Sequence, residues 1–142
     1  MKVRKCARAI IINEKHQVLL QKFVFDMVKN NKVLWVTPGG GIEKGESPSR
    51  ALERELYEEL DLKVSINEDP IFEKDVLIEG KKGDFISREF YYRLTLSSDT
   101  KIALHNMTSK EKRAFLDLKW WDKNELMKLD NLAPAELVRF LK

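Results

Sequence analysis

Three glutamates in the middle of the chain, Glu55, Glu58 and Glu59, have the type and spacing of a cation site. The intervals i, i+3 and i+4 place their side chains within an arc of about 100° on a helix, so the carboxylates converge on one face. Like charges at these intervals destabilise a helix by about 0.2–0.5 kcal/mol per pair. A hard divalent cation such as Mg²⁺ would remove that repulsion and keep positions open for water and phosphate. The alternative is a solvated acidic face, in a chain with 35% charged residues.

The helix that carries these glutamates has clear signals at its start. Ser47 is a suitable N-cap residue, and Pro48 is a suitable first helical residue. Leu52, Leu56 and Leu60 repeat every four residues and form an apolar stripe about 105° from the mean direction of the carboxylates. The sequence therefore predicts a helix with one buried flank, whose neighbouring flank faces a groove.

The rest of the chain is predicted to consist mainly of strands. Alternating and β-branched segments predict strands over residues 3–12, 17–23, 33–36, 62–66, 71–78, 85–96 and 115–121, with loops over 26–32 and 97–110. Short polar turns make the first two strands one expected hairpin, and 71–78 with 85–96 another. Asp122 and Glu125 form a capping box for a short helix, and Pro134 suits the first position of a last one. This order indicates an α/β fold in which helices flank a mixed sheet.

Length and charge limit the classes of protein that need to be considered. A chain of 142 residues with 43% hydrophobic content fits one domain over residues 1–142. The net charge of +3 does not require a nucleic-acid partner. The first segment is locally basic, and an exposed strand face is favoured over phosphate binding for Lys2, Arg4, Lys5 and Arg8. A single cysteine excludes an internal disulfide, and no apolar run approaches the ~20 residues that cross a bilayer. We expect a cytoplasmic protein that has no membrane partner.

The segment from residue 40 to residue 62 resembles the box of the Nudix hydrolase family, G-x5-E-x7-R-E-U-x-E-E-x-G-U, where U is aliphatic. The matching positions are Gly40, Glu46, Arg54, Glu55, Leu56, Glu58, Glu59 and Leu62. Only one fixed position differs, because Asp61 replaces the second glycine at the expected end of the helix. A left-handed backbone is common there, and aspartate tolerates it better than most residues. We therefore expect a modest stability cost and little effect on chemistry.

The resemblance implies the fold and activity of that family. The fold is an α/β/α sandwich with a mixed sheet, a central catalytic helix and a C-terminal helix. The activity is Mg²⁺-dependent hydrolysis of a nucleoside diphosphate linked to another group, and Mn²⁺ can replace Mg²⁺. By analogy, Glu55, Glu58 and Glu59 are catalytic and hold the metal ion, with the carbonyl of Gly39 as a further ligand. Glu55 or another glutamate is the base that activates water.

The resemblance also assigns supporting residues. Glu46 and Arg54 correspond to a structural ion pair that orients the loop against the helix. Gly40 belongs to the glycines that let this loop turn sharply and approach a metal or phosphate closely. A further acidic ligand from outside the box is expected to be Glu111, with Glu89 as the alternative.

Aromatic side chains are the candidates for stacking on a nucleobase. These are Phe25, Trp35, Tyr91 and Tyr92, most of which must belong to the core. Strand alternation sends Tyr91 and Tyr92 to opposite faces of a sheet. The expected partner is a small nucleotide, most directly a nucleoside triphosphate, rather than a nucleic acid, and a homodimer is the default assembly. Two alternatives remain open: a nucleotide sensor without catalysis, and an enzyme that trims the 5′ end of RNA.

Overall fold

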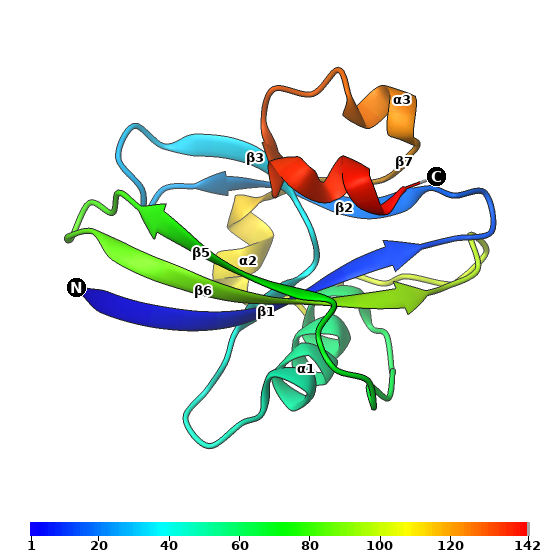
Figure 1. Ribbon diagram of the computed structural model, residues 1–142, viewed down its shortest axis with the longest axis horizontal. Helices are drawn as coiled ribbons and strands as arrows, with labels where there is room; N and C mark the ends of the chain where they lie inside the picture. Colours follow the sequence, from blue (N-terminus) through cyan, green and yellow to red (C-terminus); the bar gives the residue numbers. More distant parts are fainter. Residues whose placement is uncertain (142) are drawn as a thin grey trace.

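A strongly bent mixed β-sheet forms the centre of the structure and carries helices on both faces (Figure 1). The computed structural model describes residues 1–141. The strands are β1 (Lys2–Ile12), β2 (Val18–Phe25), β3 (Lys32–Val36), β4 (Gly39–Gly41), β5 (Phe72–Ile78), β6 (Phe85–Thr95), β7 (Phe115–Trp121) and β8 (Leu132–Ala133). The helices are α1 (Pro48–Leu60), α2 (Ser109–Ala114), α3 (Lys123–Leu126) and the 3-10 helix η1 (Ala135–Phe140).

The strand order is β5-β6-β1-β2-β3-β8, with β4 paired to β1 and β7 paired to β2. β1 runs parallel to β6 and β3 runs parallel to β8, whereas the other pairs are antiparallel. The sheet is therefore mixed, as the sequence predicts. Both predicted hairpins are confirmed: β1 pairs antiparallel with β2, and β5 with β6.

The sheet opens into two arms where β1 and β2 separate. The two strands pair next to their turn, at Ile12 and Val18. Farther from the turn, β1 takes β4 as its partner through residues 6–8, while β2 continues with β3 and β7. One arm thus contains β1, β5 and β6, and the other contains β2, β3 and β7 (Figure 1).

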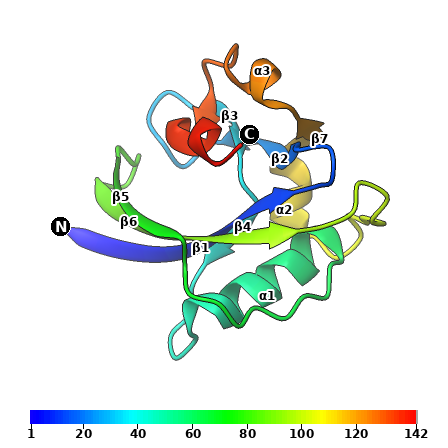
Figure 2. The same cartoon turned by 45° about the vertical axis from the view of Figure 1, so that its right-hand side comes forward.

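Two hydrophobic cores fix the layers on either side of β1. Alternation along β1 turns Ala9 and Ile11 toward α1, where they pack with the leucine stripe predicted for that helix. Ile10 and Ile12 point the other way, into a core that includes Leu137 of η1. This arrangement of α1 on one face and α3 with η1 on the other is the α/β/α sandwich that the sequence predicts (Figure 2).

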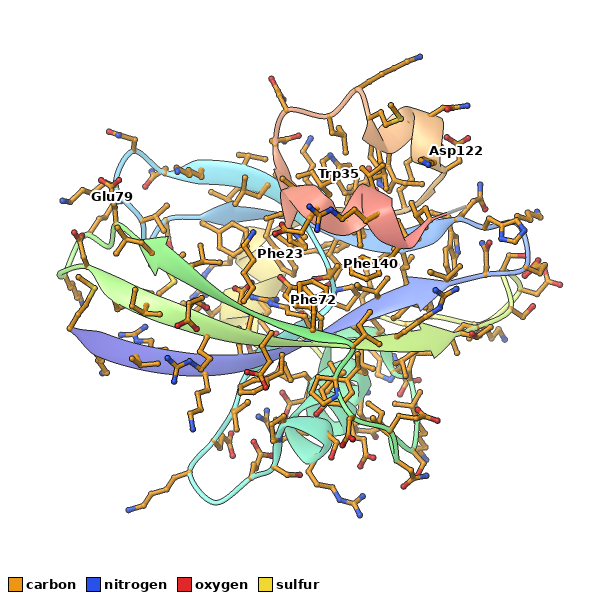
Figure 3. All side chains as sticks on the ribbon, viewed as in Figure 1. Phe23, Trp35, Phe72, Glu79, Asp122 and Phe140 are labelled. Carbon is orange, nitrogen blue, oxygen red and sulfur yellow. The ribbon has the colours of Figure 1, made fainter. Side chains whose placement is uncertain are left out.

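Aromatic rings join η1 to the sheet. Phe72 of β5 stacks on Phe140 of η1, with a centroid distance of 5.0 Å (Figure 3). Phe72 also stacks on Tyr91 of β6, with a centroid distance of 4.4 Å. Tyr91 belongs to the core on this side and Tyr92 to the core beneath α1, which confirms the predicted alternation. The stacked rings hold the C-terminal segment over the space between the two arms.

The predicted helix signals are found at both ends of α1. The side chain of Ser47 accepts a hydrogen bond from the Arg50 N–H, and Pro48 begins the helix. Asp61 ends it in the left-handed conformation, with φ 57° and ψ 36°. Its N–H donates to the carbonyls of Leu56 and Tyr57, so aspartate occupies the position that the pattern reserves for glycine.

Three expectations about local structure were wrong. Residues 62–66 form no strand; they run back alongside α1, where Leu62 and Ile66 are buried and the Ile66 N–H donates to the Glu53 carboxylate at 2.8 Å (Figure 2). Pro134 is the N-cap residue of the last helix rather than its first residue, and that helix is 3-10. The last residues of the predicted loop 97–110 instead form the start of α2, whose N-cap residue is Thr108.

Within residues 1–141, no helix combines the length and the apolar character needed to cross a membrane.

Candidate metal and substrate site

The glycine-rich segment and α1 bring the acidic side chains to the space between the two arms. β4 pairs with β1 at residues 6–8, and residues 42–47 then lead into α1. The leucine stripe holds α1 against the sheet, which turns the glutamate face toward β4. Gly39 has a φ of +140°, a conformation that favours glycine.

A compact cluster of three carboxylates lies at this place. Glu55 and Glu59 come from α1, and Glu111 comes from α2. One carboxylate oxygen from each lies within 4.8 Å of the other two. Residues that are more than fifty positions apart in the chain therefore converge, and we call Glu55, Glu59 and Glu111 the acidic cluster.

Glu59 is the most deeply buried member of the acidic cluster, with 4% of its surface exposed. Its Oε1 accepts a hydrogen bond from the Gly39 N–H at 3.0 Å. Burial, reinforced by the nearby charge of Glu55, raises the pKa of Glu59 to about 8. Burial also raises the pKa of Glu55. Both shifts mean that negative charge here is unfavourable until a cation compensates it.

Glu58 lies beside the acidic cluster rather than within it. Its side chain is 37% exposed, and its Oε2 lies 3.4 Å from Nη1 of Arg54. The charge of Glu58 still acts on the acidic cluster, because it helps to raise the pKa of Glu55. The structure therefore places all three sequence-predicted glutamates on one helix face, with Glu58 at the solvent side.

Arg54 ties the loop to the helix. Its Nε and Nη2 donate to the two carboxylate oxygens of Glu46 at 2.8 and 2.9 Å, and Nη2 also donates to the Gly41 carbonyl at 3.0 Å. The hydrogen bonds that Arg54 donates to Glu46, with one from the Glu43 N–H, hold the pKa of Glu46 at about 2. Nη1 donates to Oε1 of Glu55 at 3.0 Å, so the same guanidinium orients one member of the acidic cluster.

The acidic cluster fits a hard divalent cation. Three carboxylates supply oxygen ligands, which Mg²⁺ and Mn²⁺ prefer over nitrogen or sulfur. The backbone at Gly40 leaves space for these ligands, since a Cβ built there would lie 2.5–2.7 Å from the carboxylate atoms of Glu55. The Gly39 carbonyl, the other ligand implied by the sequence resemblance, accepts a hydrogen bond from Arg8 at 3.3 Å.

Replacing Gly40 with alanine should weaken Mn²⁺ binding by about 10- to 100-fold, because the new methyl group would displace the Glu55 carboxylate. The matched control is Gly41→Ala, since a Cβ at Gly41 meets no atom within 4 Å. Calorimetric titration of both variants with Mn²⁺ provides the comparison. Equal affinities would show that the close approach at Gly40 does not shape the metal site.

Two adjoining cavities lie near the acidic cluster, and the smaller one reaches it. The smaller, of about 220 Å³, is lined by Glu59 and Glu111. The larger, of about 490 Å³, lies between the two arms, with Glu89 and Tyr91 in its wall. Arg8, Phe25 and Val36 line both cavities, which makes them parts of one cleft.

The other residues that the sequence suggested for ligand binding differ in whether they reach the cleft. Phe25 lines both cavities, and Tyr91 lines the larger one, where its hydroxyl donates to Glu89 at 2.6 Å. Glu89, the alternative acidic ligand, therefore lies apart from the acidic cluster that contains Glu111. Trp35 is buried in the core, with its ring centroid 4.8 Å from that of Trp121, and is not brought to the cleft.

Two features of the site were missed at the sequence level. Arg8 was assigned to an exposed strand face, but it points into the cleft because it shares the inner face of β1 with Ile10. The short helix α2 was also missed, although Thr108 and Glu111 carry a local signal for it. They form a capping box in which each side chain accepts a hydrogen bond from the other residue's backbone N–H. That signal would have predicted a helix start at the residue that completes the acidic cluster.

Comparison with known proteins agrees with this geometry. The profile described as NUDIX domain matches residues 2–141. Residues of the chain are 41% identical over 56 positions to an RNA pyrophosphohydrolase of Roseobacter denitrificans, covering 39% of this chain and 32% of that protein. They are 40% identical over 60 positions to an 8-oxo-dGTP diphosphatase of Escherichia coli, covering 42% of this chain and 45% of that protein. Each of these matches spans less than half of the relative's length.

The fold has close structural counterparts. The Escherichia coli dihydroneopterin triphosphate pyrophosphohydrolase superimposes with a TM-score of 0.69 at 18% sequence identity. The superposition covers 99% of this chain and 97% of that one. At this identity the likeness establishes the shared fold.

Proposed function

The chain belongs to the NUDIX domain family, and we propose that it hydrolyses a pyrophosphate bond in a nucleoside diphosphate derivative with Mg²⁺ as the metal ion. The observation that carries the proposal is the acidic cluster, whose three carboxylates converge next to a cleft. A solvated acidic face, the alternative raised by the sequence, does not account for the depth at which Glu59 is buried.

Hydrolysis of a phosphoanhydride needs an aligned water and compensation of charge on the phosphate oxygens. In the proposal, Glu55, Glu59 and Glu111 hold the ion, with Glu58 and the Gly39 carbonyl as further ligands. Bound there, Mg²⁺ would neutralise the phosphate oxygens and activate the attacking water. Water oxygen bonds to one phosphorus, the bridging P–O bond breaks, and both products leave as phosphate anions.

The proton released by the water passes to a glutamate. Glu55 is the proposed base, because burial raises its pKa and its side chain, which is 13% exposed, is more open to water than that of Glu59. The Arg54 Nη1 contact at 3.0 Å fixes the orientation of this carboxylate. Arg54 is in turn held by Glu46, so the Glu46–Arg54 pair acts as the positioning device for the base.

A nucleoside triphosphate or related small nucleotide is the proposed substrate. The larger cavity has the size typical of a small-molecule site, and its wall mixes aliphatic side chains with a few charged groups. Phe25, which lines both cavities, is the proposed stacking residue for the base. The opposite faces of this cleft come from different arms of the sheet, so a bound nucleotide would bridge them.

The 5′ end of RNA is a second candidate substrate. It is supported by the name of the Roseobacter denitrificans relative and by Lys2, Arg4 and Lys5, which are exposed along β1. A polynucleotide that follows these side chains should bind with a steep dependence on salt concentration. Salt-independent binding of triphosphorylated RNA would remove this candidate.

A phosphate-release screen tests the proposed function. The purified protein is incubated with nucleoside triphosphates, deoxynucleoside triphosphates, nucleoside diphosphate derivatives and triphosphorylated RNA, each with Mg²⁺, with Mn²⁺ and with a chelator. We expect release from at least one class, and only with metal. Nucleotide binding without release across the whole panel would instead identify a nucleotide sensor.

A further inference from the structure

Arg8 occupies the junction of the two cavities. It lies on β1, opposite Gly39 of β4 on one side and Tyr91 of β6 on the other. Its side chain lines the small cavity together with Glu59 and Glu111, and the large cavity together with Glu89 and Tyr91. A ligand that extends from the acidic cluster into the larger cavity would lie next to Arg8, Phe25 and Val36, and Arg8 is the charged residue among them.

Within residues 1–141, the guanidinium of Arg8 forms no ion pair, although Glu59 and Glu89 line the same cavities. Nη1 donates long hydrogen bonds to two backbone carbonyls, at 3.4 Å to Thr37 and 3.3 Å to Gly39. Within residues 1–141, none of its nitrogen atoms lies within 4.0 Å of a carboxylate oxygen. Arg8 is half-buried, and a partly buried arginine is normally paired, because an unpaired charge that is withdrawn from water is costly. An arginine in this state is suited to an anion that arrives with the ligand.

The position of Arg8 relative to the acidic cluster indicates which kind of anion Arg8 would bind. Gly39 connects the two, since its carbonyl accepts from Arg8 and its N–H donates to Glu59 at 3.0 Å. A single residue, Gly39, therefore bridges Arg8 and the most buried member of the acidic cluster. Two linked phosphates could span this interval, one at the acidic cluster and the next at Arg8. The planar guanidinium matches the paired oxygens of a phosphate better than an ammonium group does.

We propose that Arg8 binds the substrate phosphate on the nucleoside side of the cleaved bond, and so selects ligands in which two phosphates are linked. This proposal rests on the proposed function, because it assigns the acidic cluster to the other phosphate. It makes Arg8 a substrate-binding residue outside the glycine-rich loop and α1. It also explains why a basic residue is placed on the inner face of β1, next to Ile10 of the core.

The test compares Arg8→Gln with Arg4→Gln, which removes an exposed arginine from the same strand. Arg4 lies over the Phe85 ring at 4.4 Å and does not line either cavity. Calorimetry measures the binding of inorganic pyrophosphate and of inorganic phosphate, and a separate titration measures Mn²⁺ affinity without phosphate. We expect Arg8→Gln to weaken pyrophosphate binding by on the order of 30- to 100-fold. The Mn²⁺ affinity of Arg8→Gln should change far less than its pyrophosphate affinity, and the pyrophosphate affinity of Arg4→Gln should remain close to that of wild type.

Arg8→Lys provides the second variant. It keeps the charge but loses the paired geometry, so it should restore part of the pyrophosphate affinity, and it guards against a folding defect in Arg8→Gln. Pyrophosphate binding that Arg8→Gln leaves unchanged, or wild-type protein that binds pyrophosphate no better than phosphate, would overturn the proposal. These measurements require no turnover, so they separate a failure of the Arg8 assignment from a failure of the proposed hydrolysis.

Discussion

Replacing Glu59 with glutamine should lower kcat for pyrophosphate hydrolysis by on the order of a hundred- to a thousandfold at saturating Mg²⁺. Glutamine preserves the shape of the side chain, and its carbonyl oxygen can still accept the hydrogen bond that the Gly39 N–H donates to Oε1. What is lost is one negative charge from the acidic cluster. The fold should remain intact, so the effect reports on metal binding and charge compensation rather than on folding.

The control for this variant is Glu43→Gln. Glu43 belongs to the same glycine-rich loop, but its side chain is 70% exposed and lies 3.8 Å from Arg54 at the outer end of the ion-pair network. Steady-state kinetics on the best substrate of the screen should show wild-type kcat for Glu43→Gln. Comparable activity in Glu59→Gln and wild type would mean that the acidic cluster does not perform the chemistry.

The same Glu59→Gln variant should be more stable than wild type when no metal is present, by about 2–4 kcal/mol at pH 8. Burial raises the pKa of Glu59 from 4.5 to about 8, so the folded protein binds more protons than the unfolded chain between these values. The stability that protonated Glu59 contributes is therefore fully present below about pH 4.5 and is lost as the pH rises through 8. Glutamine carries no titrating group, so this loss should disappear.

Urea unfolding with a chelator, at pH 5 and at pH 8, measures the difference. Wild type should lose stability between the two pH values, whereas Glu59→Gln should lose much less, and Glu43→Gln should behave like wild type. Added Mg²⁺ should restore stability to the wild type at pH 8 and do less for Glu59→Gln, because the variant has one carboxylate fewer in the acidic cluster and holds the ion more weakly. A wild type that is equally stable at both pH values would contradict the buried, uncompensated charge at Glu59.

The parts of the site that depend on local geometry could be predicted from the sequence. Helical spacing alone places Glu55, Glu58 and Glu59 on one face, and the caps at Ser47 and Asp61 delimit the helix. Such signals involve residues within a few positions of one another. Their outcome depends little on the rest of the fold.

The parts of the site that depend on tertiary packing could not be predicted from the sequence. Which face of β1 meets the cleft is decided by β4, β6 and the divergence of β2, so the sequence does not indicate that Arg8 points inward. Trp35 and Phe25 are both aromatic residues near the same loop, yet Trp35 packs on Trp121 and Phe25 lines the cleft. Segment 62–66 has the composition of a strand, but α1 and not a neighbouring strand is its partner.

The most direct test of the central claim is anomalous diffraction from crystals soaked in Mn²⁺. The claim is that the acidic cluster holds the ion that supports cleavage of a phosphoanhydride. The expected result is an anomalous peak bound by carboxylate oxygens of Glu55, Glu59 and Glu111. Mn²⁺ that is found elsewhere, or nowhere, while these three carboxylates keep their mutual contacts without an ion would contradict it.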